Sequence, residues 1–284
     1  MRNTRRSRGW RSSGPPVPAP QATTRCVRLI EWVTFDFRAA VLFGLIAGIS
    51  LVVIGGAVAV WLIERRRHRG LGLLTAKQPL HAKWWRDQRG GHGELLYVAM
   101  GDSAAQGIGA SRPGRSYVGL IAKHLRASTG QTVRVVNLSQ AGARLREALA
   151  KQVPQLEALE PDVLTVSVGA NDIAEFEPTR FAREFDELCA ALPPRALVAD
   201  VPSFHLGDRE RSVKVANAIV RKTVAQYGLT LVPLHATTKR RGVSRTALRD
   251  VSVDFFHPND RGYNTWASAF LPLLPKAIDR AVRH

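Results

Sequence analysis

The chain has 284 residues, of which 45% are hydrophobic, enough for one sizeable folded domain and an additional segment. Its net charge is +18, but residues 1–92 alone hold 16 Lys and Arg against 4 Asp and Glu, a balance of +12 that surrounds a hydrophobic stretch. This distribution favours contact with lipid headgroups and argues against a nucleic-acid partner, while only two cysteines, Cys26 and Cys189, exclude a disulfide scaffold.

The first third of the chain is predicted to contain an arm, a membrane span and a linker. Residues 1–38 carry eight arginines and a proline-rich stretch, a composition typical of a disordered arm. Residues 39–63 contain no charge, and a helix needs about 20 apolar residues to cross the hydrocarbon core. We therefore predict a single-pass transmembrane helix in the cell membrane, longer than the roughly 7–15 apolar residues of a signal peptide. Residues 64–92 are predicted to be a basic juxtamembrane linker that contacts membrane lipids. Within it, Trp84-Trp85 suit either the bilayer surface or packing against the domain.

Two properties of this span are left open by the sequence. Four arginines directly after it favour a cytoplasmic C-terminal domain, but the opposite flank has an arm with eight arginines that would then have to be translocated. Gly44 and Gly48 form a GxxxG spacing that permits close helix packing and a weak homodimer. Glycine is common in membrane spans, so this spacing alone does not establish a dimer.

Residues 93–284 alternate between short apolar runs and amphipathic stretches. Several of the runs are rich in β-branched residues, as expected for strands buried on both faces of a parallel sheet. The predicted strands are Leu95–Met100, Val133–Leu138, Val163–Val168, Ala196–Val201 and Leu229–Leu234. The predicted helices are Tyr117–Ser128, Arg144–Leu159, Thr179–Leu192, Arg209–Tyr227 and Gly262–Val282. This alternation predicts a three-layer α/β/α fold with right-handed crossovers.

Candidate catalytic residues follow these strands. Ser103 comes directly after the first strand, and a serine hydroxyl becomes a nucleophile when a base takes its proton. His257 is the candidate base, and Asp254, three residues earlier, is the candidate partner that orients its imidazole. Taken singly, Ser103 would be read as a helix cap and the Asp254–His257 pair as a solvated loop. Because ligands bind beyond the carboxyl ends of parallel strands, their shared placement favours one site.

The same edge of the sheet offers candidate donors for an oxyanion. They are the backbone N–H groups of Ser103 and Gly142 and the side-chain amide of Asn171. Asp102 and Asp172 are interpreted as residues that cap turns and tie loops together. Candidate substrate contacts near the site are Phe204, Leu206, Phe255 and Phe256, which suit an apolar acyl group, and His205, which follows the fourth strand and is placed to line the pocket. The arginines Arg112, Arg115 and Arg144 suit an anionic headgroup or simply solvent.

Together, Ser103, Gly142, Asn171 and His257, with Asp254 three residues before the histidine, resemble the four blocks of the SGNH (GDSL) hydrolase family over about residues 94–284. The first block reads Gly-Asp-Ser-Ala, with Ala104 where the family name has Leu. The resemblance implies a flavodoxin-like fold with a five-stranded parallel sheet, and hydrolysis of small-molecule or lipid esters.

The leading hypothesis is a membrane-anchored serine esterase or acylhydrolase that works through a Ser-His-Asp triad and an acyl-enzyme, without a cofactor or metal. An acyltransferase that uses the same triad and a non-catalytic, membrane-tethered binding module are the alternatives. A metal-dependent hydrolase is disfavoured because the sequence lacks HxxxH, HxH and clustered carboxylate patterns.

Overall fold

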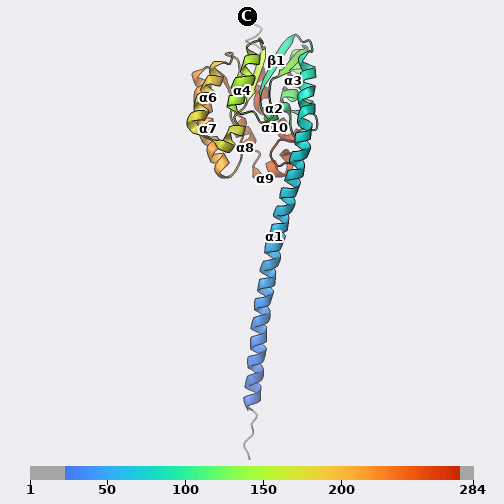
Figure 1. Cartoon of the computed structure of the whole chain (residues 1–284), viewed down its shortest axis with the longest axis vertical. Coiled ribbons are helices and arrows are strands. Elements are labelled where there is room, and N and C mark those ends of the chain that lie inside the picture. Colours follow the sequence, from blue (N-terminus) through green and yellow to red (C-terminus); the bar gives the residue numbers. More distant parts are fainter. Residues whose placement is uncertain (1–22, 276–284) are drawn as a thin grey trace, which may run out of the picture. The chain divides into compact units, whose positions relative to one another are not determined.

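The computed structural model describes residues 23–275. The chain forms two units, residues 1–62 and residues 63–284, which are described separately. The first described element, helix α1, spans Thr23–Arg89 and contributes to both units (Figure 1).

In the first unit, α1 carries the predicted membrane span. The span is helical throughout, and its described side chains are exposed or half-buried, with no apolar cover. By length and composition it is a candidate for crossing a membrane. The helix begins at Thr23, so the expected disordered arm of residues 1–38 is helical from that residue onward. The prolines of the arm all precede Thr23, which leaves residues 23–38 free of helix breakers. Residues 1–22 of the arm lie outside the described residues.

In the second unit, the C-terminal part of α1 packs against the folded domain. Leu74, His81 and Trp85 are buried, although residues 64–92 were expected to form a linker. Helicity continues through Pro79 and ends at Arg89, before Gly90-Gly91. Tertiary contacts of one helix face stabilise helices more than intrinsic propensity does, and this explains the difference. The end of α1 is therefore a structural part of the domain.

Five parallel strands form one sheet in the order β2-β1-β3-β4-β5, which is the order of a flavodoxin-like fold. Their bounds are Leu95–Gly101 (β1), Val133–Asn137 (β2), Val163–Ser167 (β3), Leu197–Ala199 (β4) and Thr230–Val232 (β5). All five predicted strands are confirmed. In the register, Val98 pairs with Val136 of β2 and Leu164 of β3. The order places β1 and β3 at the centre, so the segments that follow them lie side by side.

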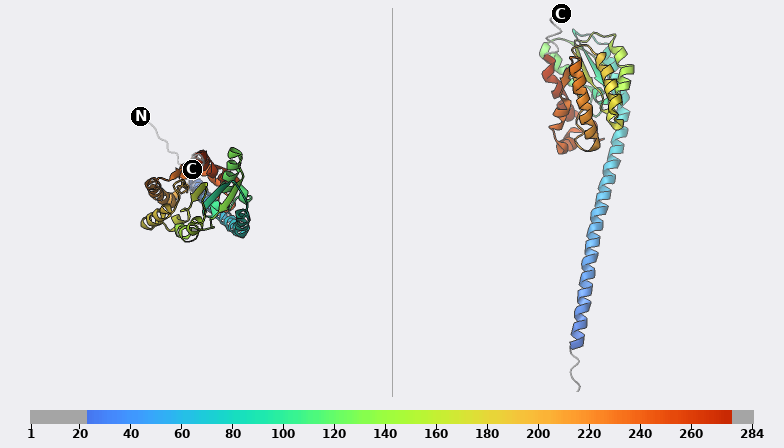
Figure 2. Two further views of the ribbon diagram at one scale, coloured as in Figure 1. Left: turned by 90° about the horizontal axis from the view of Figure 1, so that it is seen from above. Right: turned by 90° about the vertical axis from the view of Figure 1, so that its left-hand side faces the viewer.

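Helices cover both faces of this sheet (Figures 1 and 2). The longer ones are α3 (Tyr117–Thr129), α4 (Leu145–Lys151), α6 (Pro178–Ala190), α7 (Gly207–Gln226) and α10 (Asp260–Phe270). Shorter helical segments are α2 (Ser103–Gln106), η1 (Pro113–Arg115), α5 (Val153–Leu156), η2 (Asn171–Glu175), α8 (Leu234–Lys239), α9 (Val243–Arg245), η3 (Thr246–Asp250) and η4 (Leu271–Leu273). The predicted helix 144–159 is divided into α4 and α5 around Gln152. The predicted last helix is interrupted by η4 and is helical again at residues 274–275, and residues 276–282 lie outside the described part.

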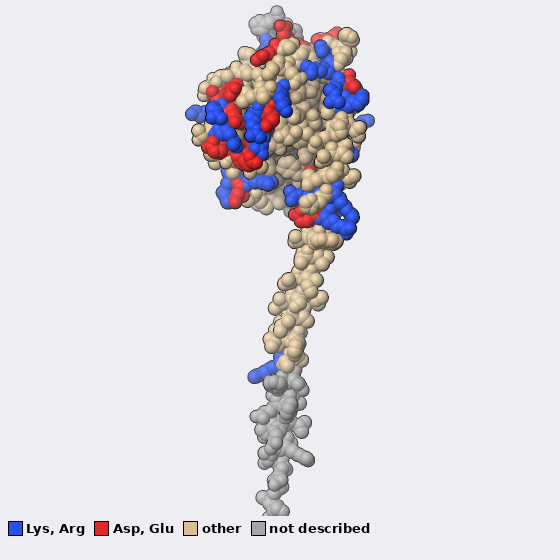
Figure 3. Space-filling model, viewed as in Figure 1, with Lys and Arg blue, Asp and Glu red and all other residues tan. Residues whose placement is uncertain are grey.

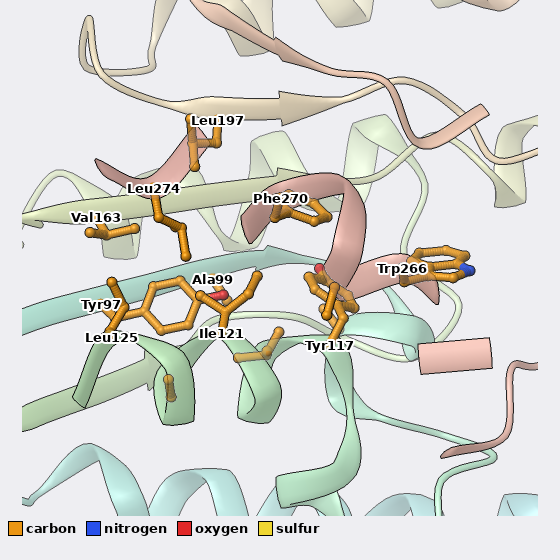
Figure 4. Close-up of a cluster of buried hydrophobic side chains, with 14 of the residues drawn as sticks. Tyr97, Ala99, Tyr117, Ile121, Leu125, Val163, Leu197, Trp266, Phe270 and Leu274 are labelled. Carbon is orange, nitrogen blue, oxygen red and sulfur yellow. The ribbon is translucent and has the colours of Figure 1, made fainter. Parts of the chain in front are cut away.

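The hydrophobic core consists of one layer on each face of the sheet. Alternate residues of β1 divide between them, since Tyr97 and Ala99 face α3 and α10, while Val98 and Met100 face α4, α6 and α7. Figure 4 shows the first layer, where Tyr117 stacks on Phe270 with ring centroids 5.3 Å apart. Cys189 is buried in the second layer, and burial raises the pKa of its thiol to about 12, as expected for a structural cysteine.

The docking of α1 predicts a difference between two adjacent tryptophans. Trp85 is 3% exposed and its Nε1–H donates to the Gln106 carbonyl at 3.0 Å, whereas Trp84 is 36% exposed. We expect Trp85→Ala to lower the free energy of unfolding by about 3–5 kcal/mol, and Trp84→Ala by much less. Denaturant unfolding of the full chain in detergent measures both. Equal losses for the two variants would contradict the docking of α1 on the domain.

Candidate active site

The candidate nucleophile is held at the junction of β1 and α2. Gly101 ends the strand, and a Cβ there would lie 2.7 Å from the Ser167 carbonyl oxygen, so only glycine fits. The Asp102 carboxylate caps α2 by accepting from the Ala104 N–H at 2.9 Å. Ser103 is the first residue of α2 and is 7% exposed. Its backbone N–H therefore has no acceptor within its own helix.

The candidate base lies in the loop between η3 and α10. An antiparallel bridge between Val251 and Pro258 closes this loop, and Phe255 at its tip has a φ of 56°, in the left-handed region that most side chains avoid. Asn259 caps α10 by accepting from the N–H groups of Arg261 and Gly262. A closed loop followed by a capped helix fixes the backbone on which Asp254 and His257 lie.

A continuous chain of hydrogen bonds joins three side chains. His257 Nδ1 lies 2.5 Å from Asp254 Oδ2, and His257 Nε2 lies 2.9 Å from Ser103 Oγ. The other Asp254 oxygen accepts from the N–H groups of Phe256 and His257, both at 3.1 Å. The pKa of Asp254 is lowered from its ordinary value. Burial alone would raise it, but the hydrogen bond to His257, the charge of His257 and the two backbone N–H donors together outweigh the effect of burial. A fully buried carboxylate thus remains ionised beside the imidazole.

The two other predicted blocks meet the first at the same edge. Gly142, in the loop after β2, has a φ of 78°, and a Cβ there would meet nothing within 4 Å. The positive φ, and not a lack of space for a side chain, explains why glycine occupies this position. The open space beside it leaves room for a substrate. Asn171 Nδ2 donates to the Ala143 carbonyl at 3.0 Å and makes a long 3.4 Å contact with Asp102 Oδ2. The second amide hydrogen is therefore only weakly engaged.

A pocket of about 190 Å³ opens at this site, and Ser103, Asn171 and His257 line it. Four of the predicted substrate contacts, His205, Phe204, Phe255 and Phe256, also line the pocket, whereas Leu206 is exposed and does not. The Phe204 and Phe256 rings lie 6.1 Å apart. The surface that faces Ser103 is thus largely apolar, which suits an acyl group.

The three arginines considered for an anionic headgroup do not line the pocket. Arg144 instead makes a two-pronged ion pair with Glu175 at 2.7 and 3.0 Å, and Arg112 and Arg115 are exposed to solvent. Arg241 lines the pocket instead, but its Nε–H donates a hydrogen bond to Oδ2 of the buried Asp250 at 2.8 Å. In the described part of the chain, no group of three or more His, Cys, Asp or Glu side chains has the arrangement of a metal site.

Several buried residues that the sequence analysis did not single out support these loops. Gln152 holds both backbone groups of Gly101, accepting from its N–H at 2.9 Å and donating to its carbonyl at 2.8 Å. The Gln106 side chain donates to the Ser139 carbonyl, which ties α2 to the loop that carries Gly142. Glu210 accepts from the N–H groups of Phe204 and His205. The sequence shows these residues only as polar side chains in or beside helices, which does not identify a partner.

Comparison with known proteins decides the family. The profile of the GDSL-like Lipase/Acylhydrolase family matches residues 99–265, more than half of the chain. The chain belongs to this family. It is a hydrolase acting on ester bonds. A comparison with curated proteins gives no match for this GDSL-like hydrolase.

Solved structures share the fold of this GDSL-like hydrolase at low identity. LAE5, an alpha/beta hydrolase from the metagenome of Lake Arreo, Spain, has a TM-score of 0.54 and 22% identity, covering 66% of this chain and 98% of its own. The acetyl xylan esterase AlAXEase has a TM-score of 0.52 and 18% identity, covering 63% and 98%. The esterase EstA from Pseudoalteromonas sp. has a TM-score of 0.51 and 18% identity, covering 66% and 100%. The similarity is limited to the fold of the hydrolase domain.

The buried Asp102 predicts a pH-dependent stability for this GDSL-like hydrolase. Burial raises the pKa of Asp102 from 3.8 to about 6, against the opposing effects of the Ala104 N–H and the His257 charge. The folded state then binds the proton more tightly than the unfolded state, so this group destabilises the fold as the pH rises from about 4 through 6. Asn at this position keeps a capping oxygen and removes the charge.

We therefore expect Asp102→Asn to gain stability relative to wild type between pH 4 and pH 7, by up to about 3 kcal/mol. Thermal unfolding across this range measures the gain. The pKa of Asp172 is also raised, but it affects the stability of both proteins equally and so leaves their difference unchanged. Asp208→Asn, at a side chain that is 87% exposed, is the control. A stability difference that does not change with pH would contradict the buried charge.

Proposed function

We propose that this GDSL-like hydrolase is a membrane-anchored serine esterase or acylhydrolase with Ser103 as nucleophile. The observation that carries the proposal is the chain of hydrogen bonds from Asp254 through His257 to Ser103, at 2.5 and 2.9 Å. His257 Nε2 takes the proton of Ser103 as Oγ attacks the ester carbonyl carbon, and Asp254 stabilises the imidazolium that forms. The imidazolium then gives its proton to the departing alkoxide, leaving an acyl-enzyme on Ser103.

The negative oxygen of the tetrahedral intermediate needs preorganised donors. In the proposal these are the backbone N–H groups of Ser103 and Gly142 and the Asn171 amide. The end position of Ser103 in α2 and the open space at Gly142 support this assignment. Asn171 would exchange its 3.4 Å contact with Asp102 for the oxyanion, while its bond to the Ala143 carbonyl keeps the amide oriented.

Water resolves the acyl-enzyme in the proposed reaction. An acyltransferase would use the same triad with another acceptor, and a binding module would leave the triad unused. The hydrogen-bonded triad and the apolar pocket support ester hydrolysis, which the family also performs. Among the structural relatives, two are acetyl xylan esterases, which makes short acyl esters natural first substrates to test.

Residues 39–63 would serve as the anchor rather than as a cleaved signal sequence. The same helix continues without a break to Arg89, and within the second unit its end packs into the domain through Leu74, His81 and Trp85. A domain that incorporates the helix end benefits from keeping it attached. The basic flank after the span would contact lipid headgroups. The side of the membrane and the weak homodimer through Gly44 and Gly48 stay predictions from the sequence.

The triad predicts a graded loss of activity in two variants. We expect Ser103→Ala to lower kcat on the order of 10⁶-fold, and Asp254→Asn by about 10⁴-fold, because the base still reaches the nucleophile in the second variant. Hydrolysis of p-nitrophenyl acetate by the full chain in detergent measures both, and Ser268→Ala, an exposed serine of α10, is the control.

A fluorophosphonate probe should label wild type and Ser268→Ala but not Ser103→Ala. If Ser103→Ala hydrolysed the ester as fast as wild type, the nucleophile assignment would be wrong.

The oxyanion donors predict a loss in kcat rather than in KM. Asn171→Ala removes a donor that acts on the intermediate, so we expect kcat to fall by roughly 10²–10³-fold with a small change in KM. Steady-state kinetics on the same ester separate the two constants. A variant with raised KM and normal kcat would show that Asn171 binds the substrate in its ground state instead.

A further inference from the structure

Five apolar side chains of residues 243–256, the segment that leads to His257, are exposed to solvent. They form what we call the apolar rim: Val243, Leu248, Val253, Phe255 and Phe256. Leu248 is 83% exposed, more than any large apolar side chain of the candidate membrane span, where the highest value is 76%. Single apolar residues are common on protein surfaces, but a group of them around a pocket marks an interaction site.

The apolar rim is continuous with both the pocket and α1. Phe255 and Phe256 line the pocket that contains Ser103, and Leu248 and Val253 line a neighbouring groove whose other wall includes Leu73 of α1. The rim therefore extends from the pocket mouth to the surface of α1, all within residues 63–284.

Two contacts place the rim beside the first turns of α1 after the apolar stretch. The Arg66 guanidinium lies 6.0 Å from the centre of the Phe255 ring. Gly70 is so close to the Val253 carbonyl that a Cβ would come within 2.5 Å of its oxygen. Because a helix rises 1.5 Å per residue, Arg66 and Gly70 lie only about 5 and 10 Å along the helix axis from Ile63, the last residue of the predicted span.

Positive charge lies near the rim. Arg66, Arg67 and Arg69 of α1, Arg245 of α9 and Arg249 of η3 are exposed. Figure 3 shows blue side chains gathered where this part of α1 meets the domain, with few red ones among them. Of the nearby acids, Glu64 pairs with Arg67 and Asp250 is buried against Arg241. Asp260, which lines the groove, accepts hydrogen bonds from Ser111. Apolar side chains among exposed arginines complement the interface of an anionic bilayer.

We propose that the apolar rim docks on the surface of an anionic bilayer, so that the pocket mouth opens toward the membrane and takes its ester from a lipid. This inference rests on the proposed triad and anchor. In this arrangement the arginines contact phosphate groups, the rim enters the interfacial region, and an acyl chain reaches Ser103 without crossing bulk water.

The first test compares two substrates for the full chain reconstituted in vesicles. One is a fluorogenic long-chain ester within the bilayer, and the other is p-nitrophenyl acetate in water. The variant Arg245→Gln/Leu248→Ser/Arg249→Gln changes rim-side positions that do not line the pocket. The control Lys214→Gln/Val215→Ser/Lys222→Gln changes matched exposed positions on α7, which packs on the other face of the sheet.

We expect wild type to hydrolyse the bilayer ester faster in vesicles of phosphatidylcholine and phosphatidylglycerol than in phosphatidylcholine alone. The rim variant should lose roughly 30-fold of this activity, about fivefold for each arginine, and keep its acetate hydrolysis. The α7 control should keep both activities. A rim variant that hydrolyses the bilayer ester like wild type would overturn the proposal.

The second test measures docking without catalysis. In a Cys26→Ser background, where Cys189 is buried, an environment-sensitive fluorophore is attached at Leu248→Cys or, as control, at Val215→Cys. Nitroxide-labelled phosphatidylglycerol should quench the label at position 248 and not that at position 215. An unquenched label at position 248 would contradict docking of the rim on the bilayer. A second copy of the chain that covers the rim would give this same result. Quenching in a protein that hydrolyses neither ester would instead refute the triad while the docking surface stands.

Discussion

The contact between His257 Nε2 and Ser103 Oγ joins two parts of the chain that are 154 residues apart, and the domain is arranged around it. One end depends on a short helix, α2, that starts where β1 stops, and the other on a closed loop before α10. A parallel sheet makes such a meeting possible because every strand ends at the same edge. Geometry accurate to a few tenths of an ångström requires both ends to be fixed by buried polar groups.

Those polar groups are consistently satisfied by backbone partners. Asp102 accepts from Ala104, Asp172 from Leu145, Asp254 from Phe256 and His257, and Glu210 from Phe204 and His205. A buried carboxylate without partners would destabilise the fold by several kcal/mol, whereas each of these also orders a loop at the site. The cost of burial differs between them, because the pKa of Asp102 is raised while that of Asp254 is lowered.

The helix that carries the candidate membrane span is also part of the hydrolase domain. Gln106 is the last residue of α2, the helix that begins at Ser103. Its carbonyl accepts a hydrogen bond from Trp85 Nε1–H at 3.0 Å and lies 3.1 Å from His81 Nδ1. Support for the site and attachment to the apolar stretch thus reside in one continuous element. The proposed docking on a bilayer uses the same element, since the apolar rim and α1 meet at Val253 and Gly70.

The sequence by itself determined the five strands, the fold class and the residues gathered at the sheet edge, because periodic burial and residue type after a strand are local properties. Only the tertiary structure decided that Gln152 clamps Gly101, that Glu210 orders the loop at Phe204, and that α1 packs on the domain instead of forming a linker. These depend on which distant side chains meet, and no local pattern encodes that. The same reason applies to Arg144. Its charge suggested contact with an anionic headgroup, but in the structure its side chain pairs with Glu175.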